Sequence, residues 1–261
     1  QMQKVRGKDI GMIFQDPITS LNPTMKIGDQ IIEGYLLHHK SAKYSEAKDY
    51  ALRLLELVGI PHASFRFGEY PHTLSGGMRQ RVMIALALAA KPKLIIADEP
   101  TTALDVTIQA QILDLMRTIK EKTGTSFILI THDMSVVAGY CDRVLVMYCG
   151  KMIEKASVED IFSTPRHPYT QGLLQSIPRL DMPKDSPLIP IDGSPPNLTE
   201  KISGCAFCPR CKYSMPICEE QIPQLKELKK GHEVACWKTA PDQDQKSEEV
   251  LLTRQEDCKI D

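Results

Sequence analysis

Hydrophobic and polar positions between residues 74 and 99 predict a helix followed by a short buried strand. Met78 to Ala90 is apolar at helical spacing and comes directly after a Leu-Ser-Gly-Gly turn. Pro92 predicts the end of this helix, because proline has no N–H to donate and clashes with the preceding turn. Leu94 to Ala97 is a compact apolar run typical of a buried strand, and two carboxylates, Asp98 and Glu99, follow it directly.

A second helix and strand repeat this order. Asp105 suits the N-cap of a helix, and Gly124 suits its end. One face of this helix is apolar and is made of Ile108, Ile112, Leu115, Met116 and Ile119. Ser126 to Thr131 (SFILIT) is a continuous apolar run, which predicts a strand buried on both faces. Together with a shorter strand expected at Ile10 to Phe14, the pattern predicts an α/β fold.

The other segments divide into a helical region and a proline-rich region. Residues 24–73 are predicted to be mostly helical, because apolar positions from Ala47 to Val58 recur at helical spacing. Arg143 to Tyr148 and Met152 to Glu154 predict a pair of strands. From Ala156 onward the many prolines predict an extended, turn-rich chain.

The composition excludes several classes of function. A net charge of −1 gives no reason to expect a nucleic-acid partner. Hydrophobic residues make up 42% of the chain, but no apolar run approaches the roughly 18 residues of a spanning helix. Any association with a membrane is therefore expected to go through a partner. The 8 cysteines of this 261-residue chain are clustered, which favours metal binding over a small disulfide scaffold.

The glycine turn and the acidic pair have the chemistry of a nucleotide site. Gly76 and Gly77 at the head of a helix let backbone N–H groups approach an anion, and Ser75 adds a hydroxyl. Asp98 at the end of a strand can hold Mg²⁺ through oxygen, and Glu99 can orient or deprotonate an attacking water. An ordinary strand end capped by two acids is the alternative for Asp-Glu alone. The glycine turn ahead and Asp105 behind favour the nucleotide site.

Two motifs carry a resemblance to a known family. Leu74 to Met78 (LSGGM) resembles the signature sequence of the ATPase subunits of ABC transporters, and Ile95 to Glu99 (IIADE) resembles the second half of their nucleotide site. The resemblance implies a head-to-tail dimer in which Ser75, Gly76 and Gly77 contact the ATP of the partner ATPase subunit. It implies further roles for Gln15 at Mg²⁺ or the attacking water, Asp98 at Mg²⁺, Glu99 and His132 in hydrolysis, and Asp105 in the D-loop at the dimer interface.

The resemblance also implies a division of the chain. An ABC-type P-loop NTPase core is expected over residues 1–155, with a helical subdomain at about 24–90. A C-terminal extension is expected over 156–240, and an acidic, disordered tail over 241–261. The 261 residues contain no G-x-x-x-x-G-K-[ST] loop to cradle phosphates. The core is therefore expected to be N-terminally truncated, and this chain alone to be inactive.

Three segments indicate the cargo. Phe14 to Pro23, Arg166 to Thr170 and Gly193 to Pro196 resemble the dipeptide and oligopeptide importers within the family. The resemblance implies two transmembrane permease subunits, a periplasmic or lipid-anchored peptide-binding protein reached indirectly, and a peripheral place on the cytoplasmic face of the cell membrane. The alternatives are an importer of nickel or another small solute, and an ABC ATPase with no transport role.

The cysteine cluster allows two different ligand sets. Cys205, Cys208 and Cys211 give C-x₂-C-x₂-C, which on spacing alone is similar to the bacterial ferredoxin run, although Cys218 follows after six residues instead of three. The peptide-importer extension implies instead the four ligands Cys205, Cys211, Cys218 and Cys236, with Cys208 as an extra thiol.

Spacing does not choose between metals. Four thiolates suit a [4Fe–4S] cluster or a structural Zn²⁺, and His232 leaves a mixed Cys/His zinc site open. The resemblance favours the iron–sulfur cluster, and free thiols are the third alternative. Three other cysteines are assigned to packing or surface, namely Cys141, Cys149 and Cys258.

Overall fold

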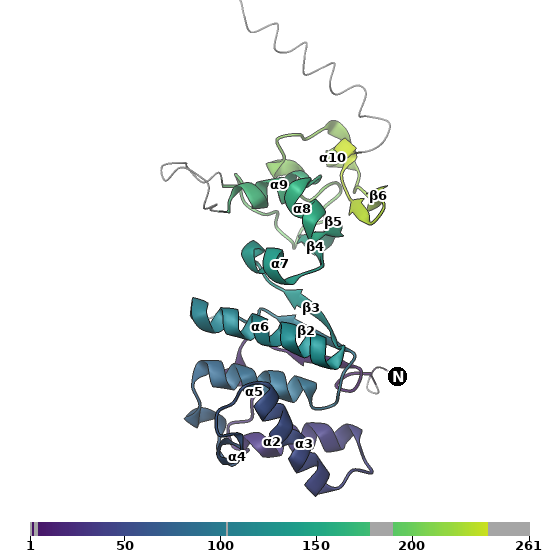
Figure 1. The fold of residues 1–261 in the computed structure, drawn as a ribbon. Helices are drawn as coiled ribbons and strands as arrows, with labels where there is room; N and C mark the ends of the chain where they lie inside the picture. Colours follow the sequence, from purple (N-terminus) through teal and green to yellow (C-terminus); the bar gives the residue numbers. More distant parts are fainter. Residues whose placement is uncertain (1, 3–4, 103, 178–189, 240–261) are drawn as a thin grey trace, which may run out of the picture. The chain divides into compact units, whose positions relative to one another are not determined.

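The computed structural model describes residues 2, 5–102, 104–177 and 190–239. The chain divides into two compact units, Gln1–His132 and Asp133–Asp261 (Figure 1). The predicted division at residue 155 falls within a strand of the second unit, and it stays a prediction. The predicted acidic tail and Cys258 lie outside the described residues.

The first unit is built on a three-stranded parallel sheet. Its strands are β1 (Ile10–Ile13), β2 (Leu94–Asp98) and β3 (Ser126–Ile130), in the order β1-β2-β3. Ile13 pairs with Ala97, and Ala97 pairs with Leu129. The parallel α/β arrangement that the sequence predicts is confirmed. It places the carboxyl ends of all three strands along one edge of the sheet.

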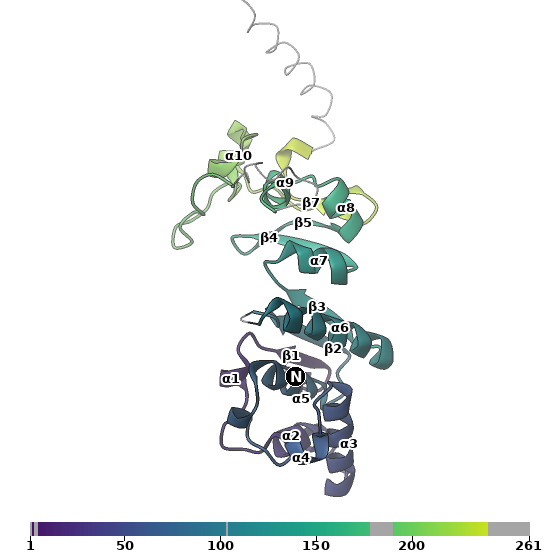
Figure 2. The same cartoon turned by 60° about the vertical axis from the view of Figure 1, so that its left-hand side comes forward.

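Two helices cover one face of this sheet. They are α5 (Gly76–Leu88) and α6 (Val106–Thr123), and both lie beside the strands in Figures 1 and 2. Ile13, Ile95 and Ala97 are completely buried under them in one hydrophobic core. The predicted caps are confirmed for α6, because Asp105 accepts a hydrogen bond from the N–H of Ile108 and Gly124 is left-handed with φ 70°.

The opposite face of the sheet is open in the described part of the chain. Met12, Ile128 and Ile130 project from it with 40%, 49% and 46% of their surface exposed. The prediction that the strand at Ser126 to Thr131 is buried on both faces is therefore wrong for these residues. An apolar run shows only that both faces of a strand can be buried, and helices α5 and α6 both lie on the same side.

Residues 17–73 form the expected helical region. Its elements are α1 (Pro17–Ser20), α2 (Ile27–His38), α3 (Tyr44–Leu57), α4 (Ala63–Arg66) and the short 3₁₀ helix η2 (Pro71–Thr73). Helices α2 and α3 share the core of α5, with Ile31, Leu55 and Ile84 fully buried. The region therefore continues the core of the sheet's covered face.

The second unit is built on an antiparallel sheet. Its strands are β4 (Arg143–Tyr148), β5 (Lys151–Ser157), β6 (Lys226–Lys229) and β7 (His232–Val234), in the order β4-β5-β7-β6. The predicted strand pair is confirmed, although β5 runs further than Glu154. Glu154 is fully buried in β5 and accepts hydrogen bonds from the N–H groups of Arg166 and His167 and from the ring of His232.

Helices replace part of the extended chain expected after Ala156. The second unit contains α7 (Met134–Tyr140), α8 (Val158–Ser163), α9 (Pro168–Gln175), the 3₁₀ helix η3 (Cys208–Arg210), α10 (Pro216–Glu220) and the 3₁₀ helix η4 (Trp237–Thr239). The many prolines do not prevent these helices, because Pro168 and Pro216 lie in the first turn, where the missing N–H costs nothing. Among the described residues no helix is both long and apolar enough to cross a bilayer.

Candidate functional site

Glu99 stands at the carboxyl edge of the parallel sheet, one residue beyond β2. Its backbone is left-handed, with φ 43°, and its N–H donates to the carbonyl of Ile130 at 2.9 Å. A left-handed backbone is uncommon for a residue other than glycine and is found at functional sites. This turn directs the side chain of Glu99 along the edge where β1 and β3 also end.

Three side chains donate hydrogen bonds to the Glu99 carboxylate. Oε2 accepts from Nε2 of Gln15 and from the hydroxyl of Thr102, both at 2.8 Å. Oε1 accepts from Nδ1 of His132 at 3.1 Å. Gln15, Glu99 and His132 come from segments far apart in the sequence, yet they form one cluster. Thr102 was not predicted as a site residue, because its contact depends on the unusual turn at Glu99.

The cluster keeps Glu99 ionised. The hydroxyl of Thr102, the ring of His132 and the amide of Gln15 hold the pKa of the Glu99 carboxyl below its usual range, and Thr102 has the largest effect. Because a carboxylate only accepts hydrogen bonds, Nδ1 of His132 carries a proton in this arrangement. The ring is 78% exposed, so its other nitrogen faces solvent.

Asp98 lies on a different side of the strand from the Glu99 cluster. It is the last residue of β2, and strand alternation places it on the same face as Ile96, which is the open face of the sheet. Gln15 uses its amide nitrogen for Glu99, which leaves its amide oxygen as a ligand for a hard cation. The two predicted magnesium ligands are thus near the ends of neighbouring strands.

The signature residues begin α5. Ser75 is the N-cap, and its hydroxyl accepts from the N–H of Met78 at 3.3 Å. A side chain at Gly76 would meet nothing within 4 Å, whereas one at Gly77 would meet Ile108 of α6 at 3.0 Å. Within the described residues no hydrogen bond joins Ser75, Gly76 or Gly77 to the Glu99 cluster.

Gln80 is a further residue that the sequence analysis missed. It is 1% exposed, and its side-chain nitrogen donates to the carbonyl of Pro100 at 2.6 Å. The bond ties α5 to the segment that follows Glu99. A polar residue within an apolar helical run was the available signal, since buried polar groups usually have a partner.

The five clustered cysteines line one small cavity in the second unit. The cavity has a volume of about 20 Å³, and its walls include Cys205, Cys208, Cys211, Cys218 and Cys236. His167 also lines it, whereas His232 does not, because His232 is buried and bonded to Glu154 at 2.8 Å. The mixed zinc site that the sequence left open through His232 is therefore not formed.

Burial favours the neutral form of three of these thiols. Burial raises the pKa values of Cys205 and Cys211, and it raises that of Cys236 to about 11. The nearby sulfurs of Cys211, Cys205 and Cys218 add to the shift at Cys236. Among the described residues no three potential ligands surround a single-ion position, as tetrahedral zinc would require with sulfurs about 3.8 Å apart.

Gly204 allows two parts of the cysteine region to meet. The N–H of Cys205 donates to the carbonyl of Cys218 at 2.7 Å, and a Cβ at Gly204 would lie 2.3 Å from that same carbonyl oxygen. Only glycine fits such a close approach of two backbones. As expected, Cys141 and Cys149 pack beside the hydrophobic core of this unit.

Solved structures with the same fold define the class of protein. The chain aligns with the dimeric ATP-binding cassette MJ0796 bound to ADP and Pi at 28% identity and a TM-score of 0.54, over 60% of this chain and 66% of that one. It aligns with cbiO1 of Clostridium perfringens, part of an ABC transporter complex, at 31% identity and a TM-score of 0.54, over 60% of each chain. With the glycine-led helix and the Glu99 cluster, this fold defines an ABC-type ATPase.

Sequence relatives narrow the class to one family. The ABC transporter family matches residues 1–102, and the C-terminal region of oligopeptide/dipeptide transporters matches residues 153–218. The oligopeptide transport ATP-binding protein OppD of Bacillus subtilis is 56% identical over 93% of this chain and 67% of its own length. The dipeptide transport protein DppD of the same organism is 52% identical over 97% and 74%. The chain belongs to the ATP-binding subunits of oligopeptide and dipeptide ABC transporters.

Proposed function

We propose that the carboxyl edge of β1, β2 and β3 hydrolyses ATP with Glu99 as the general base. The observation that carries this proposal is the convergence of Gln15, Thr102 and His132 on one carboxylate. The lowered pKa of Glu99 keeps it able to accept a proton at neutral pH. Asp98 and Gln15 offer the oxygen ligands that fit Mg²⁺, which when bound would neutralise phosphate charge.

Gln15 and His132 would control access to this base. Both oxygens of Glu99 already accept hydrogen bonds, so a water can donate to Oε2 only after the amide of Gln15 has turned away. His132 donates from Nδ1 to Glu99 and must be protonated on both nitrogens to donate to a phosphate from Nε2 as well.

The signature residues would serve a second ATPase subunit. Gly76 and Ser75 present the N-terminus of α5, which is 13 residues long and attracts anions through its dipole. Their separation from the Glu99 cluster supports a head-to-tail dimer in which each ATP lies between two chains. Asp105, already the cap of α6, would lie at that interface.

A phosphate-cradling loop is still needed, since the 261 residues contain no G-x-x-x-x-G-K-[ST]. The open apolar face with Met12, Ile128 and Ile130 offers a place where a segment bearing that loop would pack. Asp98 is on that same face, which would bring the loop's phosphates to the magnesium ligands. Hydrolysis at this site would depend on such a loop.

The cargo we infer is dipeptides or oligopeptides. The family match over residues 153–218 and the relatives' names support peptides over nickel, other small solutes or a role outside transport. The subunit would act with two transmembrane permeases at the cytoplasmic face of the membrane, and a periplasmic or lipid-anchored binding protein would deliver the peptide.

Uptake measurements test the cargo. Cells carrying the transporter should accumulate labelled di- or oligopeptides, and the Glu99→Gln variant should abolish that accumulation. Accumulation of nickel in the same cells, with no peptide uptake, would contradict the peptide assignment while leaving the hydrolytic site intact.

The cysteine cavity is the place for the proposed [4Fe–4S] cluster. A cluster bonds each of four thiolates to a different iron, and five thiols line this cavity. The cavity of about 20 Å³ has room for little more than one water molecule, so the thiol side chains would have to move apart around a cluster. When bound, it would supply a redox-active or purely structural crosslink within the second unit.

A contact with a neighbouring hydroxyl distinguishes Cys208 from Cys205, Cys211, Cys218 and Cys236, the four ligands that we propose. The sulfur of Cys208 also acts on that of Cys211, so the pKa shifts alone do not separate it from the other four. Cys208 makes a contact of 3.0 Å with the hydroxyl of Ser214. Cys208 is therefore the thiol that the cluster can do without.

Metal analysis after anaerobic purification tests the cluster and its ligands. We expect iron and acid-labile sulfide near four per chain in the wild type. Cys208→Ser should keep both, and Cys236→Ser should lose them. Stoichiometric zinc without sulfide would reject the cluster, and loss of iron from Cys208→Ser would show that the ligand set is wrong.

A further inference from the structure

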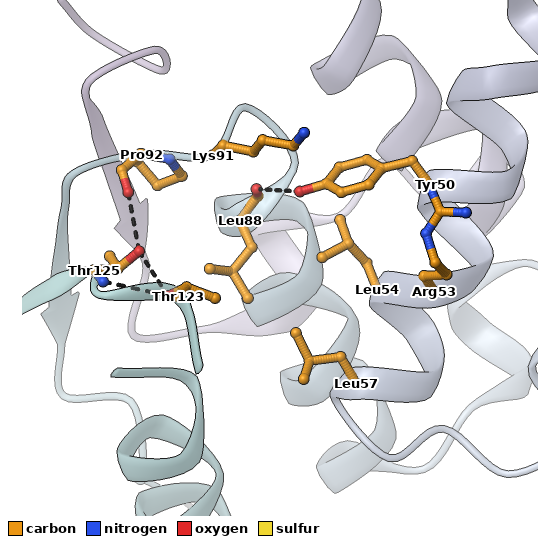
Figure 3. A pocket seen from close by; sticks show the side chains of 9 residues that line it. All are labelled: Tyr50, Arg53, Leu54, Leu57, Leu88, Lys91, Pro92, Thr123 and Thr125. Carbon is orange, nitrogen blue, oxygen red and sulfur yellow. Dashed lines mark hydrogen bonds between the residues drawn. The ribbon is translucent and has the colours of Figure 1, made fainter. Parts of the chain in front are cut away.

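A cavity of about 330 Å³ lies in the first unit, away from the Glu99 cluster. It opens between α3, the turn that follows α5, and the turn that leads into β3 (Figure 3). Its volume is within the range of small-molecule sites, which starts near 300 Å³. The nine side chains that line it are Tyr50, Arg53, Leu54, Leu57, Leu88, Lys91, Pro92, Thr123 and Thr125.

The interior of this cavity is apolar and its walls are fixed. Figure 3 shows Leu54, Leu57 and Leu88 between the polar residues of the rim. The hydroxyl of Tyr50 donates to the carbonyl of Leu88 at 3.4 Å, which joins α3 to the end of α5. On the other side the hydroxyl of Thr125 donates to the carbonyl of Pro92 at 3.0 Å. The cavity is therefore formed without a ligand.

The charges around the cavity are all positive. Arg53 and Lys91 line it, and none of the nine lining residues is acidic. Both cations lie over an aromatic ring in the described part of the chain. Nζ of Lys91 is 4.9 Å and Cζ of Arg53 is 5.9 Å from the ring centroid of Tyr50. No described carboxylate pairs with either of them.

Lys91 occupies a strained position in this rim. It comes just after α5 and has a left-handed backbone with φ 56°, while its N–H donates to the carbonyl of Leu88. Glycine is the usual residue in such a C-terminal turn, because a side chain there has a steric cost. A lysine at this place keeps a positive charge over the cavity in spite of that cost, which indicates a use for the charge.

We propose that this cavity binds a small anion with a compact apolar body, such as a branched short-chain carboxylate or the corresponding phosphate monoester. The anionic group pairs with Lys91 and Arg53, and the apolar body lies against Leu54, Leu57 and Leu88. Zwitterions such as free amino acids should bind more weakly, because no acidic side chain lines the cavity to pair with their ammonium group.

Titration calorimetry on the full chain tests this site with four matched probes. We expect saturable binding of 4-methylpentanoate or isopentyl phosphate, and the arm that binds identifies carboxylate or phosphate as the source of the anion. Leucine, which adds only an ammonium group to the first probe, and the neutral 4-methylpentanamide should each bind at least about tenfold more weakly. A bound anion should also raise the Tm in a concentration-dependent way.

Variants locate the binding. Lys91→Gly removes the charge and relieves the left-handed backbone, so the fold should be kept while the affinity falls at least about tenfold. Arg53→Gln should weaken binding similarly. Lys93→Gln, an equal loss of charge two residues from Lys91 and outside the cavity, should leave the affinity unchanged. No saturable binding of either anion at millimolar concentration, or equal losses in Lys91→Gly and Lys93→Gln, would overturn the proposal.

Discussion

At the scale of single residues, Glu99 is the side chain that we propose as the general base of ATP hydrolysis. Three donors lower its pKa: Gln15 and Thr102 both donate to Oε2, and His132 donates to Oε1. The contacts that keep it ionised therefore fill the lone pairs of Oε2, whereas Oε1 can still accept a hydrogen bond from water. Of the three donors, Thr102 lowers the pKa of Glu99 most, and it is not one of the proposed Mg²⁺ ligands.

Thr102→Val should move the pH dependence of hydrolysis. Loss of the hydroxyl raises the pKa of Glu99 toward its ordinary value, so the base becomes protonated at a higher pH. As the solution is acidified, the variant should therefore lose ATP hydrolysis at a higher pH than the wild type does. The acidic limb of its kcat profile should shift to higher pH. The matched control is Thr101→Val, and equal acidic limbs in the two variants would argue against this role of Thr102.

Gly204 is the second residue whose identity is set by its surroundings. Gly204→Ala would place Cβ 2.3 Å from the carbonyl oxygen of Cys218 and 2.5 Å from that of Glu219. We expect a loss of about 1–3 kcal/mol in the free energy of unfolding, as for overpacked sites, measured by chemical denaturation. Gly139→Ala, in a helix where Cβ meets nothing within 4 Å, should keep or raise stability; an equal effect of both would contradict the close approach.

At the scale of elements, α5 connects the parts of the first unit. Its N-terminus carries Ser75, its middle is tied to the segment after β2 through Gln80 and Pro100, and its C-terminal turn carries Lys91. Through the Gln80 bond this helix is joined directly to the segment that follows Glu99.

Gln80→Ala should weaken that connection. The change removes a buried hydrogen bond of 2.6 Å and leaves the carbonyl of Pro100 without this donor. A loss of about 1–3 kcal/mol in the free energy of unfolding is expected. Gln109→Ala, on the partly exposed surface of α6, is the control. Equal stabilities of the two variants in urea denaturation would show that the bond does not hold the segment.

Much of the Glu99 cluster could be predicted from sequence because three of its residues each follow a strand. Gln15, Glu99 and His132 come after β1, β2 and β3, and parallel strands end at one edge. Thr102 and Gln80 could not be predicted, because their contacts depend on the left-handed turn at Glu99 and on tertiary packing. The open sheet face was also unpredictable, since apolar content does not reveal whether a cover is present.

At the scale of the whole molecule, the two proposed sites belong to different units. Gln1–His132 holds the Glu99 cluster, and Asp133–Asp261 holds the cysteine cavity. The 261 residues also lack a phosphate-cradling loop. We therefore expect that the purified 261-residue chain alone shows no Mg²⁺-dependent ATP turnover. Robust turnover sensitive to Glu99→Gln would show that phosphates are held by residues other than such a loop.

The most direct test of the account is the rate of ATP hydrolysis by the assembled transporter with Glu99→Gln in this subunit. The amide is nearly the same size as the carboxylate but cannot accept a proton from water. We predict that hydrolysis at this site falls by roughly 10²–10⁴-fold while ATP binding, measured on the same preparation, is kept. The control is Glu121→Gln, on the exposed surface of α6. A transporter with this change should hydrolyse ATP at the wild-type rate. A near-normal rate in Glu99→Gln would contradict the assignment of Glu99 as the general base.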